Sequence, residues 1–271
     1  MYKGRFFFRE SVYLCGDYMD ADIYPVYQPA GKRRKKCKPT KEIQKRLNQR
    51  NAEKKLTRLI HNNFTEKDLA LHLTYKKGEH PEFEEEAQRD LYNFIRRLKR
   101  RYSRRGIELK YISCTEYGKR GGRVHHHLVV SGGVERDEIE HLWGKGFANT
   151  KRLQFDEDEG IAALAHYMTK ERHFYKRWNQ SRNLDIPQPY VRDGYVTATK
   201  MDELQTVIEN KRAWAYFEEQ YPDYELVGAD SVINGINHGA YIHYEMRKRK
   251  QPQPKKERFS LHARRGENVS V

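Results

Sequence analysis

The clearest pattern of hydrophobic and polar positions lies in the middle of the chain. Residues 69–75 (LALHLTY) alternate between apolar and polar side chains and consist largely of residues that favour strands, which predicts a β-strand. From Phe83 to Tyr102 apolar residues recur at helical spacing with basic residues between them, which predicts an amphipathic helix. Residues 109–117 and 124–130 then predict a hairpin, because glycines mark a turn between them.

Three further elements complete this pattern: a helix over residues 135–143, a strand over 149–155 and a helix over 157–172. The resulting order, β-α-β-β-α-β followed by one more helix, is that of a ferredoxin-like antiparallel sheet. We therefore predict an α+β fold in which helices pack on this sheet, with basic extensions at both ends of the chain.

The flanking regions have weaker patterns. The first 30 residues mix aromatic and acidic residues and predict an irregular arm with at most one strand, and residues 40–61 predict a basic helix. That helix is either a phosphate-contacting element or a solvated face. Towards the C-terminus we expect a helix over 202–220 and a hairpin of residues 225–233 and 240–246. The predicted regions are 1–62, a basic N-terminal arm and helix; 63–183, the core; 184–246, a C-terminal helix and hairpin packed on or beside the core; and 247–271, a basic disordered tail.

The charge of the chain indicates a polyanionic partner, although a soluble basic protein without one would have the same charge. Lys and Arg number 53 against 38 Asp and Glu, so the formal net charge is +15, and 19 tyrosines offer rings that can stack on unpaired bases. No apolar stretch reaches the roughly 18 residues that a membrane span needs. Three cysteines without close spacing argue against a disulfide framework and favour a reducing compartment. The candidate DNA-contacting residues are Lys32, Arg33, Arg34, Lys35, Lys36, Lys119, Arg120 and Arg123.

A candidate metal site lies on the predicted hairpin. Alternate residues of a strand share a face, so His125 and His127 project together, and Glu116 on the partner strand lies close enough across the turn to join them. Two imidazoles and a carboxylate suit Mn²⁺, or Mg²⁺ when a substrate phosphate and water supply the other oxygens. Exposed histidines on a strand can also be ordinary polar surface, and the nearby glutamate is what favours the metal site.

Two more histidines need placing. His126 points to the opposite face, where helices cover the sheet and a neutral imidazole needs a hydrogen-bond partner. A shift of the strand by one residue would make His126 the ligand, but Leu128 cannot bind a metal, so the pair His125 and His127 is preferred. His72, on a neighbouring predicted strand, could line the same site, but we favour a half-buried polar role for it.

A candidate nucleophile lies on the last helix of the core. Tyr167 falls roughly 110° from the centre of the apolar stripe, given the turn of an α-helix, so it lies on the flank of the helix. Lys170 follows one turn later and could stabilise charge on the phenolate or on a phosphoryl group. A tyrosine of the amphipathic surface would show the same spacing. The apolar stripe consists of Ile161, Leu164, Ala165 and Met168.

Taken together, these motifs resemble the HUH endonuclease superfamily, and most closely the single-tyrosine replication initiators of small phages, plasmids and circular single-stranded DNA viruses. The strand 69–75 resembles the first motif of that family, Glu116 with residues 125–127 (HHH) resembles its metal motif, and residues 167–171 (YMTKE) resemble its nucleophile motif. Glu171 thereby joins His72 as a secondary candidate site residue. The middle position of the metal motif is normally hydrophobic, and here it is His126.

The resemblance implies a metal-dependent DNA-nicking enzyme that initiates rolling-circle replication. Tyr167 would attack a phosphate in single-stranded DNA or an origin hairpin, forming a 5′-phosphotyrosine and a free 3′-hydroxyl, and later reversal would rejoin the strands. The chain lacks a GxxxxGK[ST] motif, so a separate helicase and a host polymerase are the implied partners. The implied location is the cytoplasm of a bacterial host, or the host nucleus if the source is a eukaryotic virus.

Two alternatives remain at the level of sequence. A single-tyrosine transposase or relaxase would share the chemistry, although the order of the motifs argues against many relaxases. A non-catalytic nucleic-acid-binding or capsid-type protein would explain the basic charge, but it has no need of Glu116, His125, His127 and Tyr167 together.

Overall fold

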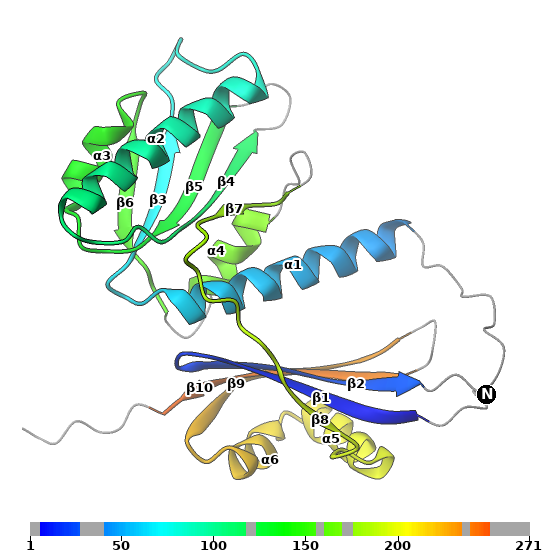
Figure 1. Ribbon diagram of the computed structural model, residues 1–271. Coiled ribbons are helices and arrows are strands. Elements are labelled where there is room, and N and C mark those ends of the chain that lie inside the picture. The colour runs from blue at the N-terminus through cyan, green and yellow to red at the C-terminus, as the bar shows by residue number, and fades with distance from the viewer. Residues whose placement is uncertain are drawn as a thin grey trace, which may run out of the picture.

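The computed structural model describes residues 6–27, 41–117, 123–155, 160–169, 176–234 and 239–249. Within these residues the chain forms six helices and two five-stranded antiparallel sheets, which confirms the α+β class. Figure 1 shows the two sheets one above the other, with helix α1 (Lys41–Asn63) running between them. Among the helices of the described residues, none combines the length and the apolar character that crossing a membrane requires.

The predicted core sheet is present. Its strand order is β6-β3-β5-β4-β7, and each described pair is antiparallel. The first four of these strands have the order and directions of a ferredoxin-like sheet, as the sequence predicts. The strands are β3 (Leu69–Thr74), β4 (Tyr111–Tyr117), β5 (Val124–Val130), β6 (Ala148–Arg152) and β7 (Asn179–Gln180).

Helices α2 (Glu84–Arg104) and α3 (Arg136–Trp143) cover one face of this sheet (Figure 1). The first turn of α2 contains acidic residues, and its last turn contains Arg101 and Arg104. These charges complement the helix dipole. The predicted apolar stripe packs on the inward side chains of β3 and β5, except that Phe83 is exposed because it precedes the helix. The stripe residues buried in this core are Ala87, Leu91, Phe94, Leu98 and Tyr102.

Helices α1 and α4 (Gly160–Thr169) lie against the opposite face. The C-terminal half of α1 presents its apolar side to α4, and both helices pack on β4 and β5. The central residues of this second core are Leu56, Leu59 and Ile60 of α1, Ile161, Ala165 and Met168 of α4, and Ile112, Cys114 and Val129 of the strands.

The first 27 residues correct the sequence analysis, which expected an irregular arm. β1 (Phe6–Cys15) and β2 (Tyr18–Tyr27) pair over their whole length around a two-residue turn in which Gly16 has a φ of +62°. This sheet has the order β8-β1-β2-β10-β9, so N-terminal strands pair with strands from the C-terminal part of the chain. The other strands are β8 (Tyr190–Asp193), β9 (Tyr224–Ile233) and β10 (Ala240–Lys248), and the last two are the predicted hairpin.

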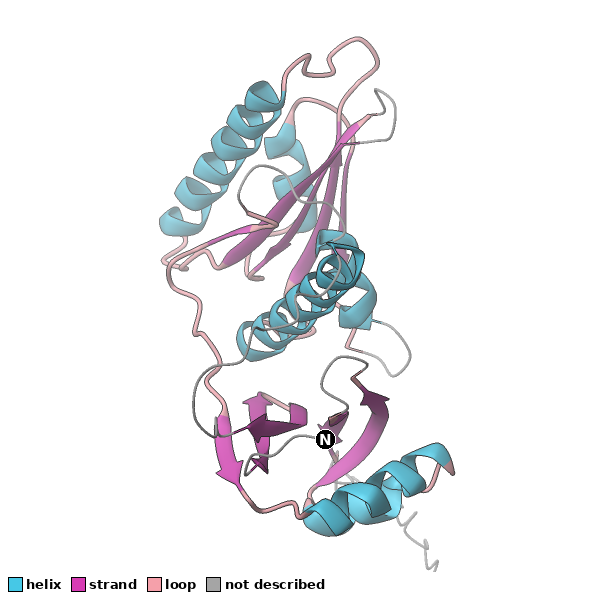
Figure 2. Cartoon of the chain, turned by 90° about the vertical axis from the view of Figure 1, so that its right-hand side faces the viewer, coloured by secondary structure: helices cyan, strands magenta, loops and turns pink. Residues whose placement is uncertain are grey.

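Two further differences concern the C-terminal region. The helix expected over 202–220 is two helices, α5 (Ala198–Glu209) and α6 (Ala213–Gln220), because the chain breaks at Lys211, which has a φ of 55°. Both helices pack on the apolar face of the second sheet (Figure 2). Residues 247 and 248, which the sequence assigned to a disordered tail, belong to β10, and residues 250–271 lie outside the described part.

Candidate metal and nucleophile site

The strand register gathers the candidate ligands on one face of the core sheet. His127 lies opposite His72 of β3, and His125 lies opposite Glu116 of β4. Because side chains alternate along a strand, all four project to the face that carries α1 and α4. That face is apolar at one end, where the two helices cover it, and polar at the end that holds these four residues. The position of His72 beside the other three was the less favoured of the two interpretations of the sequence.

The four side chains form two contacting pairs. Nε2 of His127 lies 3.3 Å from Oε2 of Glu116, and Nε2 of His72 lies 2.8 Å from Nδ1 of His125. The rings of His72 and His127 stack, with centroids 4.7 Å apart and planes 19° apart. Two adjacent ligands of an octahedral ion, each bound at roughly 2.1 Å, lie about 3 Å apart. Both separations are also ordinary hydrogen-bond distances, and no three of these residues have ligand atoms that all lie within 4.8 Å of one another, so the four donors share a face without forming a preassembled three-ligand group.

Two histidines of this face, His72 and His127, have a lowered pKa, which favours their neutral form. Burial, reinforced by the neighbouring imidazoles of His127 and His125, lowers the pKa of His72 to about 4. Burial also lowers the pKa of His127, against the opposing effect of its hydrogen bond with Glu116. A neutral imidazole keeps a lone pair free for a metal ion. These two imidazoles therefore do not have to lose a proton at neutral pH before they can act as ligands.

His126 has a different environment, as the alternation predicts. Its side chain is fully buried on the face covered by α2 and α3, where its ring lies 5.5 Å from that of Trp143. Its Nε2 lies 2.9 Å from the hydroxyl of Tyr75, and its Nδ1 lies 3.0 Å from the hydroxyl of Thr115. Burial lowers its pKa to about 3. Both ring nitrogens thus have the partners that a buried neutral imidazole needs, and His126 belongs to the core.

Tyr167 lies on α4, which packs on the same face of the sheet as the candidate ligands. Three residues of the predicted apolar stripe, Ile161, Ala165 and Met168, are buried, Leu164 is partly buried, and Tyr167 on the flank of the stripe is 56% exposed. Its helix is fixed to α1 by contacts that the sequence did not suggest. Gln49 donates a hydrogen bond of 3.0 Å to the hydroxyl of Thr169, and Glu53 lies 2.7 Å from Nδ1 of His166. Arg177 donates to both Gln49 and the carbonyl of Thr169.

Several candidate residues lie outside the described part of the chain. They are Lys170, Glu171, the basic run Lys32, Arg33, Arg34, Lys35 and Lys36, and the turn residues Lys119 and Arg120. Arg123, the last of the candidate DNA contacts, is exposed next to the start of β5.

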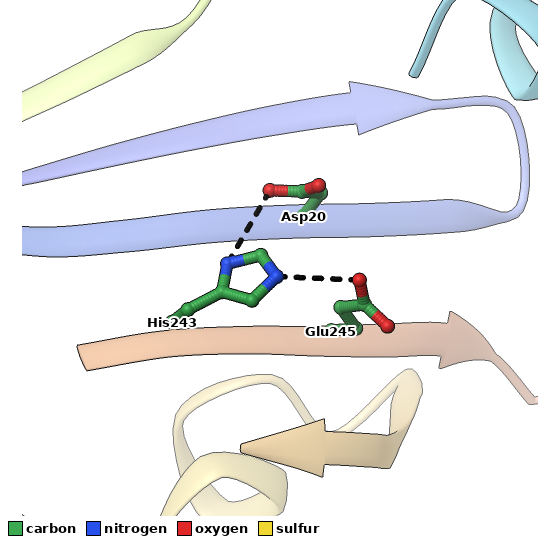
Figure 3. Close-up of side chains that lie close together, drawn as sticks. All are labelled: Asp20, His243 and Glu245. Carbon is green, nitrogen blue, oxygen red and sulfur yellow. Dashed lines mark hydrogen bonds and ion pairs between the residues drawn. The ribbon is translucent and has the colours of Figure 1, made fainter. Parts of the chain in front are cut away.

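A second group that could hold a metal ion lies in the other sheet. Ligand atoms of Asp20, His243 and Glu245 all lie within 4.8 Å of one another, with His243 between the two carboxylates (Figure 3). The alternate spacing of Asp20 with Asp22 and of His243 with Glu245 is the sequence feature that could have revealed it. Oδ2 of Asp20 is buried and accepts no hydrogen bond from the described residues, which leaves a position for a cation.

Protein cations already neutralise this group. Arg58 of α1 contacts both Asp20 and Asp22, and Lys54 contacts Asp22. Burial lowers the pKa of His243, but its hydrogen bonds with Asp22 and Glu245 outweigh that effect and raise the pKa to about 9. A protonated imidazole cannot bind a metal. Together these contacts form an ion-pair network that links α1 to the second sheet.

Comparison with known proteins places the candidate site inside a recognised segment. A family model of replication-associated proteins, the ORF2 type, matches residues 68–172. That segment runs from β3 through α4 and contains the four gathered side chains and Tyr167. It leaves out α1 and the whole second sheet. No curated protein and no solved structure matches the chain. In its core, the chain is similar to replication-associated proteins.

Proposed function

We propose that the chain is a metal-dependent DNA-nicking enzyme of the HUH type that initiates rolling-circle replication. The observation that carries this proposal is the composition of one face of the core sheet. Within the segment that matches replication-associated proteins, Glu116, His125 and His127 share this face with the helix that carries Tyr167. A protein that only packages nucleic acid has no use for this combination.

In the proposed site Glu116, His125 and His127 would hold Mn²⁺ or Mg²⁺. The bound ion would polarise a phosphate oxygen and offset the charge that develops during the reaction. His72 is a positioning residue, because its contact with Nδ1 of His125 fixes the orientation of that ring. No general base for a water molecule is needed, since the attacking group is a side chain of the protein.

The exposed hydroxyl of Tyr167 is the proposed nucleophile. Its oxygen forms a bond to phosphorus, the bond from phosphorus to the 3′-oxygen breaks, and the departing strand keeps the 3′-hydroxyl after taking up a proton. The phenolic proton passes to solvent, and Lys170 would stabilise the remaining charge. The phosphotyrosine preserves the energy of the phosphodiester, so a new 3′-hydroxyl can reverse the step and close a circle. Such an enzyme would act on single-stranded DNA or an origin hairpin, in the cell compartment where the phage, plasmid or viral DNA is replicated.

The test is capture of the covalent intermediate. The full-length protein is incubated with a random single-stranded DNA library and Mn²⁺, washed under denaturing conditions, and analysed for attached DNA by sequencing and mass spectrometry. We expect a 5′-linked nucleotide on the peptide that contains Tyr167, and no adduct when a chelator removes the metal. Efficient cutting without an adduct, or an adduct on the peptide that contains Tyr175, would exclude the proposed role of Tyr167.

Matched variants separate chemistry from folding. Tyr167→Phe should bind DNA and give no adduct, whereas Tyr92→Phe, which changes another exposed tyrosine on α2, should behave as the wild type. Tyr175→Phe should also retain most activity. His127→Ala should abolish the adduct, and His141→Ala on α3 is its exposed control. Retained DNA binding with no adduct from the wild type under any metal would leave only a binding protein.

A further inference from the structure

A groove with basic residues on one wall runs between the two sheets. The first half of α1 forms that wall, the end of β9 from Asp230 to Val232 forms the other, and His166 of α4 also lines the groove. Its volume is about 760 Å³. The segment matched by the family model contains His166 but neither of the walls. The groove is therefore built largely from the parts of the chain that surround the core.

The charge of the groove favours an anion. Lys45, Arg46 and Arg50 line it from α1 and are exposed. Of its two carboxylates, Glu53 is already engaged by the hydrogen bond from Gln49 and by His166. The other, Asp230, lies 3.9 Å from Arg50 and is largely exposed, so solvent screens this pair. Three cations that are not buried in stable ion pairs thus line a single wall.

One residue that lines the groove is the direct neighbour of the proposed nucleophile. His166 immediately precedes Tyr167, and their ring centroids are 6.3 Å apart. Gln49 and Glu53, which line the groove, are the same residues that fix α4 to α1. A chain of phosphates that followed the basic wall inwards would reach the helix that carries Tyr167.

We propose that this groove binds the single-stranded DNA next to the scissile phosphate, through backbone phosphates at Lys45, Arg46 and Arg50. This inference rests on the proposed function, because it assigns a binding track to the same site. A single strand suits the groove better than a duplex does. A helix enters a major groove of about 12 Å only when its flanks are clear, and β9 stands beside α1 here. A concave surface with cations on one wall suits one sugar–phosphate backbone.

The test compares two triple variants of equal charge in the full-length Tyr167→Phe protein, which cannot cut. One replaces Lys45, Arg46 and Arg50 with Gln. The control replaces Lys99, Arg100 and Arg104 with Gln, which removes one Lys and two Arg from exposed positions on α2, across the sheet. Affinity for oligothymidylate and for a blunt hairpin duplex is measured by fluorescence anisotropy at several salt concentrations.

We expect the groove triple to lose about tenfold or more in affinity for oligothymidylate, and its salt slope to fall by roughly 2, since each single-strand phosphate contact contributes about 0.7. The control triple should change the slope little. Asp230→Asn should have the opposite effect and tighten binding, because it removes a carboxylate beside the path of the phosphates. A role limited to holding α1 in place does not predict that gain.

Each other outcome has a defined meaning. Equal losses in the two triples would mean that only total charge matters and would overturn the proposal. A loss of affinity confined to the hairpin duplex would indicate that α1 binds in the major groove of a duplex. That result would also overturn the proposal. If the wild type forms no covalent adduct but the groove triple still binds single-stranded DNA more weakly, the proposed nicking function is wrong. The proposal that the groove binds single-stranded DNA is then still supported. If the adduct forms and the groove triple binds normally, the groove fails and the nicking function stands.

Discussion

Three consecutive histidines of β5 differ in their environments because successive side chains of a strand point to opposite faces. His125 and His127 keep contacts with other polar side chains at the open end of the sheet. His126 between them contacts only core residues and two hydroxyl groups. The chemical type of a residue therefore says little about its role here until the register of the strand is known.

His126→Ala should reduce stability rather than remove only activity. The change leaves the hydroxyls of Tyr75 and Thr115 without their imidazole partner and opens a cavity beside Trp143. We expect a loss of about 3 kcal/mol in the free energy of unfolding, measured by urea denaturation. The exposed residue His141 provides the control variant. A His126→Ala protein of normal stability that cannot form the adduct would contradict the observed register.

The lowered pKa of His61 predicts that the folded protein loses stability in acid. Its ring stacks on Tyr18, with centroids 4.0 Å apart, and burial together with the charge of Arg247 lowers its pKa from 6.5 to about 4. Between these values the unfolded chain takes up a proton that the folded protein does not, so stability is complete above pH 6.5 and falls as the pH approaches 4.

The size of this effect can be measured with His61→Phe, which keeps a stacking ring and removes the titration. Relative to the wild type, the variant should gain roughly 2–3 kcal/mol between about pH 7 and about pH 4. The measurement is urea denaturation at a series of pH values. A difference between the two proteins that does not change with pH would exclude His61 as a source of the acid sensitivity.

At the scale of elements, α1 contacts two different surfaces. Leu56, Leu59 and Ile60 pack on α4 and the core sheet, whereas Lys54 and Arg58 pair with carboxylates of the second sheet. One helix thus has an apolar side and a charged side, and both are at least partly buried. The helix therefore contacts the core sheet through apolar packing and the second sheet through ion pairs.

Removing Arg58 tests the charged side. Arg58→Met leaves Asp20, which is fully buried, without its main counter-charge, and we expect a loss of about 3–5 kcal/mol in the free energy of unfolding. Asp20→Asn combined with Arg58→Met should recover much of it, because no uncompensated charge remains. Lys200→Met breaks an exposed pair with Glu203 and should cost less than about 1 kcal/mol. Equal stability of the single and double variants would show that Asp20 does not depend on Arg58.

Sequence reasoning placed the elements with an uninterrupted period correctly, and it also placed α1 to within two residues in spite of its weaker pattern. β3, α2, β5 and the hairpin of β9 and β10 have plain alternation or a plain helical stripe, and each was predicted to within a few residues. The strands β1 and β2 were missed because their second face is charged rather than simply polar. Asp20 and Asp22 look like loop residues until the distant Lys54 and Arg58 are seen beside them.

In the candidate site, too, the sequence predicted the contacts that depend on local structure and missed those that depend on tertiary packing. The shared face of Glu116, His125 and His127 follows from strand alternation and hairpin pairing, both of which are local. The contacts of His72, and those of Gln49 and Glu53 with α4, depend on strand order and helix packing. No spacing in the sequence encodes contacts between residues 113 positions apart, such as Glu53 and His166.

At the scale of the whole molecule, the segment that matches replication-associated proteins has only part of the cover of one of its faces, because α4 belongs to the segment and α1 does not. Residues 68–172 include the sheet strands β3 to β6 with α2, α3 and α4, but not α1. In the full chain, Leu56, Leu59 and Ile60 of α1 are almost completely buried in the core that contains Ile112 and Val129. Burying each such side chain contributes about 1.5–3 kcal/mol, and the three together are comparable with the roughly 5–15 kcal/mol of a typical domain.

The last prediction is therefore that the matched core does not fold stably without α1. A fragment of residues 64–186 would expose the apolar face of β4 and β5, and we expect it to aggregate or to unfold cooperatively only at low temperature. A fragment of residues 41–186 keeps α1, exposes its charged side, and retains the hydrogen bonds of Asn63 with Asp185. It should be monomeric by light scattering and unfold in one transition by circular dichroism. A stable, monomeric 64–186 fragment would mean that α1 serves the groove and the second sheet alone, and that the core needs no cover on that face beyond α4.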